Sequence, residues 1–170
     1  MWYVIWTATG SERKLNAWIA DYMKHSLYED CFVPMVDQNR KVKGEWKTIR
    51  KPLFPGYLFV KTDDSRIGKF ADRLKRSGQF STILSTDGDF TPVNETESYL
   101  IDSAFSNEGV LGTSIGMIEG DTIKILSGPL MGLEGSIKMI NRHKRIATIE
   151  LNMFGRISRV NIGLEIISKT

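Results

Sequence analysis

Side chains that could perform catalysis are too scattered in this sequence to predict an active site. The chain of 170 residues has two histidines, His25 and His143, and one cysteine, Cys31. It contains no glycine-rich phosphate loop, nucleophile elbow or metal-ligand spacing. The paired acids at 63–64 and 87–89 fall where turns are predicted, and turn positions favour Asp. The sequence therefore predicts no enzymatic activity, no cofactor and no metal site, which leaves binding as the chemistry to explain.

Basic side chains are concentrated in two short segments, and such clusters are typical of proteins that contact a polyanion. One segment contains Arg142, His143, Lys144 and Arg145. The other segment, between positions 37 and 51, contains Arg40, Lys41, Lys43, Lys47, Arg50 and Lys51. Residues 118–170 carry the net charge of +3, with 8 Lys and Arg against 5 Asp and Glu, whereas residues 1–117 are neutral overall. Both segments are candidates for nucleic-acid binding; the alternative for each is a solvated surface turn or ribbon.

The third candidate is the aromatic turn Phe54-Pro55-Gly56-Tyr57. Pro55 fixes its own φ angle and Gly56 can adopt dihedral angles closed to other residues, so the chain can turn sharply into the apolar run at 58–60. Such a turn places Phe54 and Tyr57 side by side. The two rings form either a protein-binding surface or part of the core, where most large aromatic side chains lie.

The apolar spacing predicts an N-terminal α+β domain that positions these segments. Four strands are predicted, at 2–6, 31–33, 57–61 and 80–84. A hairpin is predicted at 37–51 with Gly44 at its tip. Helices are predicted at 15–23, where Ser11 is expected to be the cap, and at 67–74. A capping box at Asn94 and Glu97 predicts a third helix that ends near residue 105.

A change of pattern beyond residue 105 predicts a second domain. Residues 106–116 contain several Gly, Ser and Thr without a period, which is typical of a flexible linker. Residues 117–170 contain five short apolar runs separated by glycines, which predicts a small β-barrel. The predicted domains are therefore 1–105 and 117–170. The sequence has neither a membrane span nor a secretory leader, so we expect a monomeric cytoplasmic protein with no membrane partner.

Three segments, in this order and spacing, resemble the NusG family of transcription elongation factors. They are Phe-Pro-Gly-Tyr at 54–57, Gly-Pro-Leu-Met-Gly-Leu-Glu-Gly at 128–135 and Asn-Met-Phe-Gly-Arg at 152–156, and the start Met-Trp-Tyr-Val-Ile also fits. The resemblance covers nearly the whole chain and implies an α+β protein. An NGN domain, an antiparallel sheet with flanking helices, would be linked to a KOW domain, a small SH3-like barrel. Some relatives fold the KOW segment as a helical hairpin, but the glycines and β-branched residues here favour the barrel.

The resemblance implies that the N-terminal domain binds bacterial RNA polymerase. In the NusG family an apolar pocket of the NGN domain grips the clamp helices of the largest polymerase subunit, which is helix-in-groove recognition. Phe54 and Tyr57 would form this pocket, because they match the family motif, and Trp6 and Phe32 on neighbouring strands are further candidates. The substitution Phe54→Ser is therefore expected to abolish polymerase binding and to leave the fold intact.

The resemblance also implies nucleic-acid and protein partners. NGN domains lie beside upstream DNA and the non-template strand, which would involve Arg40, Lys41, Lys43 and Lys47. RNA, such as a leader hairpin, would contact Arg142, His143, Lys144 and Arg145. The aromatic loop of KOW domains meets a small-subunit ribosomal protein or the termination factor Rho, which points to Phe154 and Arg156. The alternative for Phe154 is that it closes the barrel core.

The function implied is a transcription elongation and antitermination factor that promotes read-through of pauses and terminators. The amino-acid sequence of residues 52–60 and the basic loop at 142–145 resemble the specialised paralogues of the RfaH and LoaP type. Two alternatives stay open: a general NusG-type elongation factor, or a ribosomal or structured-RNA-binding protein that makes no polymerase contact.

Overall fold

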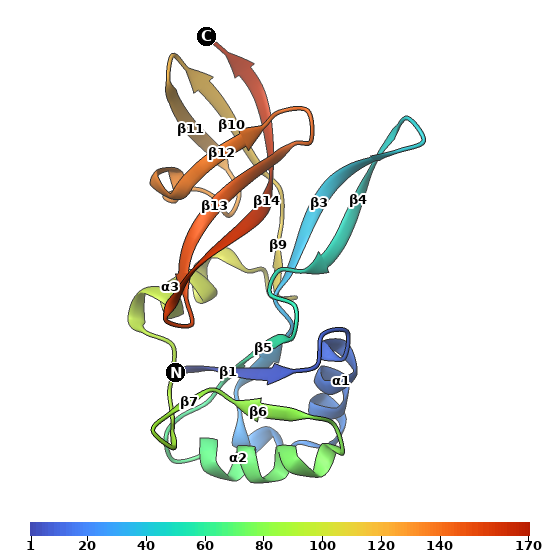
Figure 1. Ribbon diagram of the computed structural model, residues 1–170, viewed down its shortest axis with the longest axis vertical. Coiled ribbons are helices and arrows are strands. Elements are labelled where there is room, and N and C mark those ends of the chain that lie inside the picture. Colours follow the sequence, from blue (N-terminus) through green and yellow to red (C-terminus); the bar gives the residue numbers. More distant parts are fainter. The chain divides into compact units, whose positions relative to one another are not determined.

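The computed structural model describes residues 1–170 and divides into two compact units (Figure 1). The first unit contains Met1–Pro34 and Phe54–Ser98, and the second contains Met35–Leu53 and Tyr99–Thr170. The predicted hairpin thus belongs to the same unit as the C-terminal strands. The boundaries predicted at residues 105 and 117 stay a prediction.

The first unit is a four-stranded antiparallel sheet with the strand order β2-β5-β1-β6. Its strands are β1 (Trp2–Thr7), β2 (Asp30–Phe32), β5 (Tyr57–Lys61) and β6 (Ser81–Ile83). Its helices are α1 (Glu12–Tyr22), α2 (Ile67–Leu74) and the short 3-10 turns η1 (His25–Leu27) and η2 (Lys75–Ser77). A two-stranded ribbon, β7 (Ser85–Thr86) with β8 (Asp89–Phe90), leads to α3 (Glu95–Ala104), which crosses the boundary between the units.

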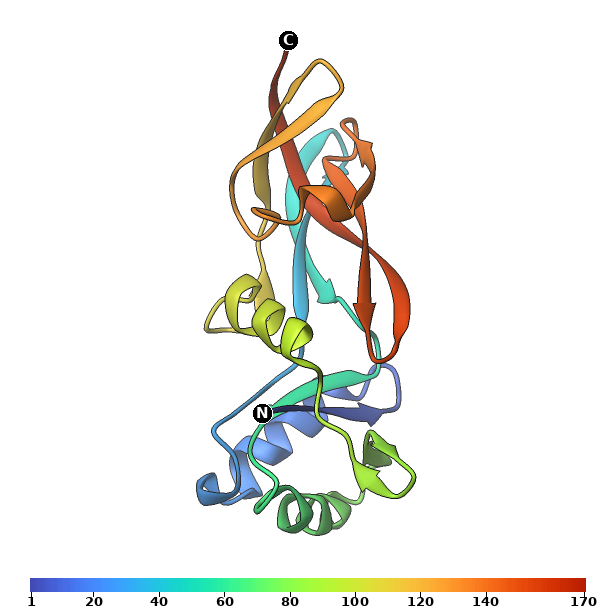
Figure 2. The same ribbon diagram turned by 90° about the vertical axis from the view of Figure 1, so that its left-hand side faces the viewer.

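The two faces of this sheet differ, because side chains alternate along each strand. Figures 1 and 2 show α1 and α2 on one side of the sheet. The strand residues that fall on that side, by alternation, are the buried Tyr3, Ile5, Leu58 and Val60. The apolar stripes of the helices, with Leu15, Ile19, Phe70 and Leu74, are buried as well. The opposite face carries the aromatic side chains described below.

The second unit contains a five-stranded sheet and a three-stranded sheet. The five-stranded sheet, in the order β11-β10-β14-β13-β12, is formed by β10 (Ser114–Glu119), β11 (Thr122–Ser127), β12 (Ile137–Asn141), β13 (Ile146–Met153) and β14 (Arg156–Lys169). A 3-10 turn, η3 (Glu134–Ser136), precedes β12. The three-stranded sheet, in the order β4-β3-β9, is formed by β3 (Met35–Val42), β4 (Glu45–Pro52) and β9 (Val110–Leu111). The expected β-rich C-terminal domain is confirmed, and residues 114–170 contain no helix beyond η3.

A close backbone contact explains the Gly-Pro-Leu segment at 128–130. Gly128 has φ +100°, and a Cβ placed there would lie 2.6 Å from the Cα of Ser114. The hydroxyl of Ser114, which is fully buried, accepts a hydrogen bond from the amide of Leu130 at 3.0 Å. The segment is thereby fixed on β10, and Leu130 fills the core of the five-stranded sheet.

Local signals for the helices had mixed outcomes. The capping box is confirmed: the amide of Glu97 donates to Asn94 Oδ1 at 2.8 Å, and the amide of Asn94 donates to Glu97 Oε2 at 3.2 Å. Ser11 occupies the N-cap position of α1 as predicted, but its side chain makes no capping hydrogen bond. The stretch 106–116, predicted as a flexible linker, contains β9, which pairs in parallel with β3, and the start of β10.

The acids at 63–64 stabilise the turn before α2. The carboxylate of Asp63 accepts hydrogen bonds from the amides of Ser65 and Arg66 and from the Arg66 guanidinium, the last at 2.7 Å. These donors, with the Arg66 side chain first, lower the pKa of Asp63 to about 2. Asp64 accepts a hydrogen bond from the Tyr3 hydroxyl, whose pKa is raised by burial and by this bond. Both acids thus have a structural role at this turn.

Candidate binding sites

The aromatic turn at 54–57 is anchored by a buried carboxylate, Glu12. Glu12 is the first residue of α1 and is only 3% exposed. Its Oε1 accepts a hydrogen bond from the amide of Gly56 at 2.6 Å, and its Oε2 accepts one from the amide of Gly10 at 2.8 Å. Gly56 has φ +87°, and a Cβ there would lie 3.0 Å from the carbonyl oxygen of Thr7. The turn is therefore fixed to both β1 and α1, and glycine is needed at its third position.

Four rings form a cluster on the face of the sheet opposite α1 and α2; we call it the aromatic face (Trp2, Phe32, Phe54 and Phe59). Edge-to-face contacts join Phe59 to Phe32 at 5.6 Å, to Phe54 at 6.4 Å and to Trp2 at 6.4 Å between ring centroids. Trp2 also contacts Phe32 at 5.4 Å. Such pairs contribute about 0.5–1.5 kcal/mol each beyond the area that they bury.

Phe54 is more deeply buried than its expected role implied. It is 7% exposed, so the substitution Phe54→Ser removes core packing as well as any contact surface. A buried Phe truncated to a small residue costs about 3–5 kcal/mol. The expectation that this substitution leaves the fold intact is therefore not supported by the geometry, and better probes of the surface are needed.

Trp6 provides such a probe. It is 45% exposed, lies opposite Tyr57 in the register of β1 and β5, and contacts the ring of Phe80 edge-to-face at 5.4 Å. Phe80 is itself 61% exposed, and Tyr57 is half-buried. Of the four residues predicted to bind RNA polymerase, Phe32 and Phe54 thus lie in the aromatic face, and Trp6 and Tyr57 lie beside one another at its end. Sequence reasoning missed Trp2, Phe59 and Phe80; the period-two alternation from Trp6 and Tyr57 would have found the first two.

The β3–β4 hairpin packs on β14 within the second unit. The side-chain amide of Gln38, which is 9% exposed, donates a hydrogen bond to the backbone carbonyl of Asn161. Gly163 on β14 lies so close to the hairpin that a Cβ there would be 3.1 Å from the carbonyl oxygen of Asp37 and 2.7 Å from Thr113 Oγ1. The hairpin is held internally by the bidentate ion pair of Arg50 with Asp37 at 2.8 and 3.1 Å. Its position is thus defined by contacts that only a small residue at 163 permits.

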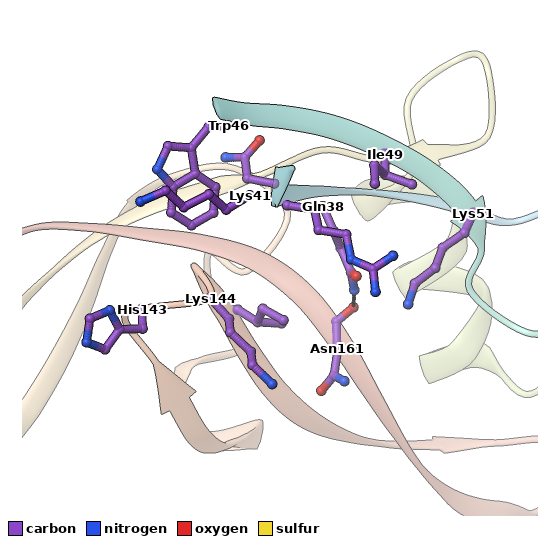
Figure 3. A pocket seen from close by; sticks show the side chains of 11 residues that line it. Gln38, Lys41, Trp46, Ile49, Lys51, His143, Lys144 and Asn161 are labelled. Atoms are coloured by element: carbon purple, nitrogen blue, oxygen red, sulfur yellow. Dashed lines mark hydrogen bonds between the residues drawn. The ribbon is translucent and has the colours of Figure 1, made fainter. Parts of the chain in front are cut away.

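A groove of about 450 Å³ lies between this hairpin on one side and the β12–β13 turn, β13 and β14 on the other; we call it the basic groove (Figure 3). It is lined by Gln38, Asn39, Arg40, Lys41, Trp46, Ile49, Lys51, His143, Lys144, Ile146 and Asn161. Four of these residues are Lys or Arg, and none is Asp or Glu. Figure 3 shows Trp46 and Lys41 on the hairpin side and His143 and Lys144 on the opposite side. The lining of the groove therefore presents positive charge without an acidic residue, together with amide groups, one indole ring and one imidazole.

The two basic segments predicted from the sequence meet at this groove. Arg40 and Lys41 come from the hairpin, and His143 and Lys144 come from the turn between β12 and β13. Arg145 reaches the hairpin as well, because its guanidinium lies over the ring of Trp46 at 4.1 Å. The other predicted residues lie outside the groove lining: Lys43 at the hairpin tip with φ +51°, Lys47 on β4 opposite Arg40, and the exposed Arg142. Lys51, also named in the basic segment, lines the groove. Sequence reasoning missed Trp46, and a Trp between basic residues of a predicted ribbon was the available signal.

The remaining candidates, Phe154 and Arg156, flank the turn between β13 and β14. Phe154 has φ +59°, an uncommon angle for a residue other than glycine, and its side chain is half-buried. Arg156 lies at the surface as the first residue of β14. Whether this turn binds a partner stays a prediction.

Two further observations concern the chain as a whole. The structure contains no group of three or more His, Cys, Asp or Glu side chains arranged to hold a metal ion. None of its helices is long and apolar enough to cross a membrane.

Comparison with known proteins assigns both parts of the chain. The model of the family described as transcription termination factor NusG matches residues 1–101, more than half of the chain. The chain belongs to the NusG family. The KOW motif matches residues 119–151. The NusG match thus includes the aromatic turn and the hairpin, and the KOW match includes the basic turn at 142–145 but ends before Phe154.

Curated relatives extend the similarity over nearly the full length. A protein of Bacillus subtilis is 27% identical over 180 aligned positions, which cover 99% of this chain and 97% of the relative. A protein of Thermus thermophilus is 23% identical and covers 99% of this chain and 97% of the relative. A protein of Chlamydia pneumoniae is 26% identical and covers 94% and 89%. All three are named transcription termination/antitermination protein NusG.

Proposed function

We propose that this chain is a transcription elongation and antitermination factor of the cytoplasm that binds bacterial RNA polymerase through its first unit and nucleic acid through its second. The observation that carries the proposal is the anchored aromatic turn within the region matched by the NusG family. The names of the relatives, which refer to termination and antitermination, support the same function.

The polymerase contact would be made at the end of the aromatic face. Trp6 and Phe80 expose large apolar area beside Tyr57, and exposed aromatic rings of this kind are typical anchors for a partner helix. The buried rings of Phe54 and Phe59 would hold this surface in place. We propose the clamp helices of the largest subunit as the partner. Binding them would favour a closed clamp, so the factor would act by shifting a conformational equilibrium of the polymerase and would itself make or break no bond.

The nucleic-acid contact would be made by the basic groove, and a protein contact by the turn at Phe154 and Arg156. RNA emerging from the polymerase is the first candidate for the groove, and upstream or non-template DNA is the second. A small-subunit ribosomal protein or Rho would meet the turn. The basic turn at 142–145 favours a specialised antiterminator over a general elongation factor, because a basic turn that reads a leader RNA would make the activity leader-dependent.

A binding experiment with purified bacterial RNA polymerase tests the proposal. Trp6→Ala removes an exposed aromatic anchor, and losses of about 2 kcal/mol at such anchors correspond to roughly thirtyfold weaker binding. Tyr22→Ala is the matched control, because Tyr22 is 62% exposed on α1, away from the aromatic face. Loss of polymerase affinity in the first variant and retention in the second is expected. Equal affinities for wild type and Trp6→Ala would contradict the assignment.

The second candidate function is a structured-RNA-binding protein, such as a ribosomal protein, without polymerase contact. The basic groove favours it as much as it favours an antiterminator. An exposed aromatic surface in a separate unit would then have no role, which is why we prefer the polymerase-binding function. A folded chain that binds RNA but shows no affinity for polymerase would favour the second candidate.

A further inference from the structure

The basic groove is built from two segments about a hundred residues apart, and their contacts fix its shape. One wall is the β3–β4 hairpin, held against β14 by the hydrogen bond of Gln38 to Asn161 and by the close approach at Gly163. The other wall is the turn between β12 and β13, whose Asn141 side chain accepts a hydrogen bond from the amide of Lys144 at 2.9 Å. The two walls belong to one compact unit, so the groove is a feature of the folded unit rather than of either segment alone.

Trp46 is held in the groove in a way that leaves part of its ring accessible. The guanidinium of Arg145 lies over the ring at 4.1 Å, and the side chain remains 38% exposed. The backbone of Arg145, which has φ +53°, is fixed because its carbonyl accepts a hydrogen bond from the amide of Leu164 at 3.0 Å. Arg145 thus orients the ring, and the part of the ring that stays exposed is where a base can stack.

The remaining lining has the groups that contact nucleotides. Arg40, Lys41, Lys51 and Lys144 supply positive charge for phosphates, with no acidic residue among them. The side-chain oxygens of Asn39 and Asn161 accept hydrogen bonds from the hydroxyls of Thr48 and Thr148, and the NH₂ groups of both amides can donate to base edges. A volume of about 450 Å³ is within the range of about 300–1,000 Å³ of pockets for single small ligands and is too small for a duplex.

We propose that the basic groove binds an unpaired nucleotide of a single-stranded segment, with its base stacked on Trp46 and its flanking phosphates on the lysine and arginine side chains. A duplex keeps its bases stacked on one another, so their faces are not available to an aromatic ring. This inference makes the proposed function more specific, because it states which class of nucleic acid the second unit binds. It rests on the proposed function, since the bound strand would come from the transcription complex. RNA and DNA strands share this chemistry, and the experiment distinguishes them.

Fluorescence anisotropy with the full chain and labelled oligonucleotides tests the proposal without polymerase. The probes are a ten-nucleotide single-stranded RNA of mixed sequence, the DNA of the same sequence and the corresponding RNA duplex. Trp46→Ala is expected to weaken single-strand binding about five- to hundredfold, with little change in its salt dependence, since no charge is lost. Lys144→Ala is expected to reduce the slope of log affinity against log salt by about 0.7. Trp46→Phe keeps a stacking ring and is expected to recover most of the affinity.

The controls separate this inference from folding and from the polymerase contact. Lys124→Ala removes one exposed positive charge on β11, outside the groove, and should bind like wild type. Trp6→Ala should also bind the strand like wild type. Tighter binding of RNA than of DNA would indicate that the groove binds a transcript. Equal binding would indicate that it accepts RNA and DNA strands alike, and both results support nucleotide binding in the groove. Unchanged affinity of Trp46→Ala, or duplex binding as tight as single-strand binding, would overturn the proposal even if polymerase binding is intact.

Discussion

Replacing Glu12 with Gln should displace the aromatic turn and destabilise the first unit. The carboxylate of Glu12 accepts two backbone hydrogen bonds, from Gly56 at 2.6 Å and from Gly10 at 2.8 Å, and the residue is 3% exposed. Hydrogen bonds to a charged group contribute about 1.5–3 kcal/mol each. A glutamine can accept one of them through its oxygen, but its NH₂ group faces the second amide, so a buried donor is left without an acceptor. We expect a loss of about 2–4 kcal/mol in the free energy of unfolding.

Two measurements check this expectation. Urea unfolding gives the change in stability, and hydrogen exchange of the Gly56 amide reports whether the turn opens locally. Glu95→Gln is the matched control, because Glu95 occupies the corresponding first position of α3 but is exposed. A change below about 0.5 kcal/mol for Glu12→Gln, the size usual for surface substitutions, would refute the role assigned to this carboxylate.

Three further changes test other parts of the structure. Gly163→Ala should lower the free energy of unfolding by about 1–3 kcal/mol, because its Cβ would overlap the side chain of Thr113 and crowd the hairpin backbone. Gly135→Ala is the control: no atom lies within 4 Å of the added Cβ, so the free energy of unfolding should change little in the same urea titration. Wild type should be more stable than Asp63→Asn by its full margin above about pH 4, and this margin should disappear as the pH falls towards 2. The reason is that the folded-state pKa of Asp63 is lowered from 3.8 to about 2. A difference in unfolding free energy that stays constant across this range would contradict the ion pair with Arg66. Desolvation, followed by the nearby Asp30, raises the pKa of the half-buried Cys31 thiol. Its reaction with a disulfide reagent at pH 8 should therefore be at least about tenfold slower in the folded than in the urea-unfolded chain, and equal rates would argue against the raised pKa.

Much of the fold follows from local sequence signals. The apolar spacing locates α1 and α2, and the capping box at Asn94 and Glu97 forms as the sequence predicts. The hairpin with Gly44 at its tip and the β-rich C-terminal region are likewise present. These features depend on residues within a few positions of one another, where periodicity and turn chemistry decide the outcome.

Contacts between distant residues explain where sequence reasoning failed. Ser11 is a good capping residue, but the buried acceptor beside it is Glu12, whose partner Gly56 lies 44 positions away. The burial of Phe54 depends on its packing against Phe59 across the turn. The hairpin packs on β14, more than a hundred positions further along the chain, where the glycine at 163 permits the approach. No local pattern encodes such pairings.

The same reasoning applies to the basic groove. Each basic segment was recognisable in the sequence, and each had a solvated surface as its alternative. Only the fold brings Lys41 and Lys144 to one groove and places Arg145 over Trp46. The composite site is therefore a product of tertiary structure.

Transcription in vitro tests the central claim most directly, because it requires both binding surfaces in one chain. The template would carry a structured leader followed by an intrinsic terminator, transcribed by a bacterial RNA polymerase. We expect wild type and Tyr22→Ala to increase read-through only when the leader is present, and Trp6→Ala and Trp46→Ala each to lose this increase. Folded wild-type protein that binds the polymerase and leaves read-through unchanged on both templates would contradict the claim.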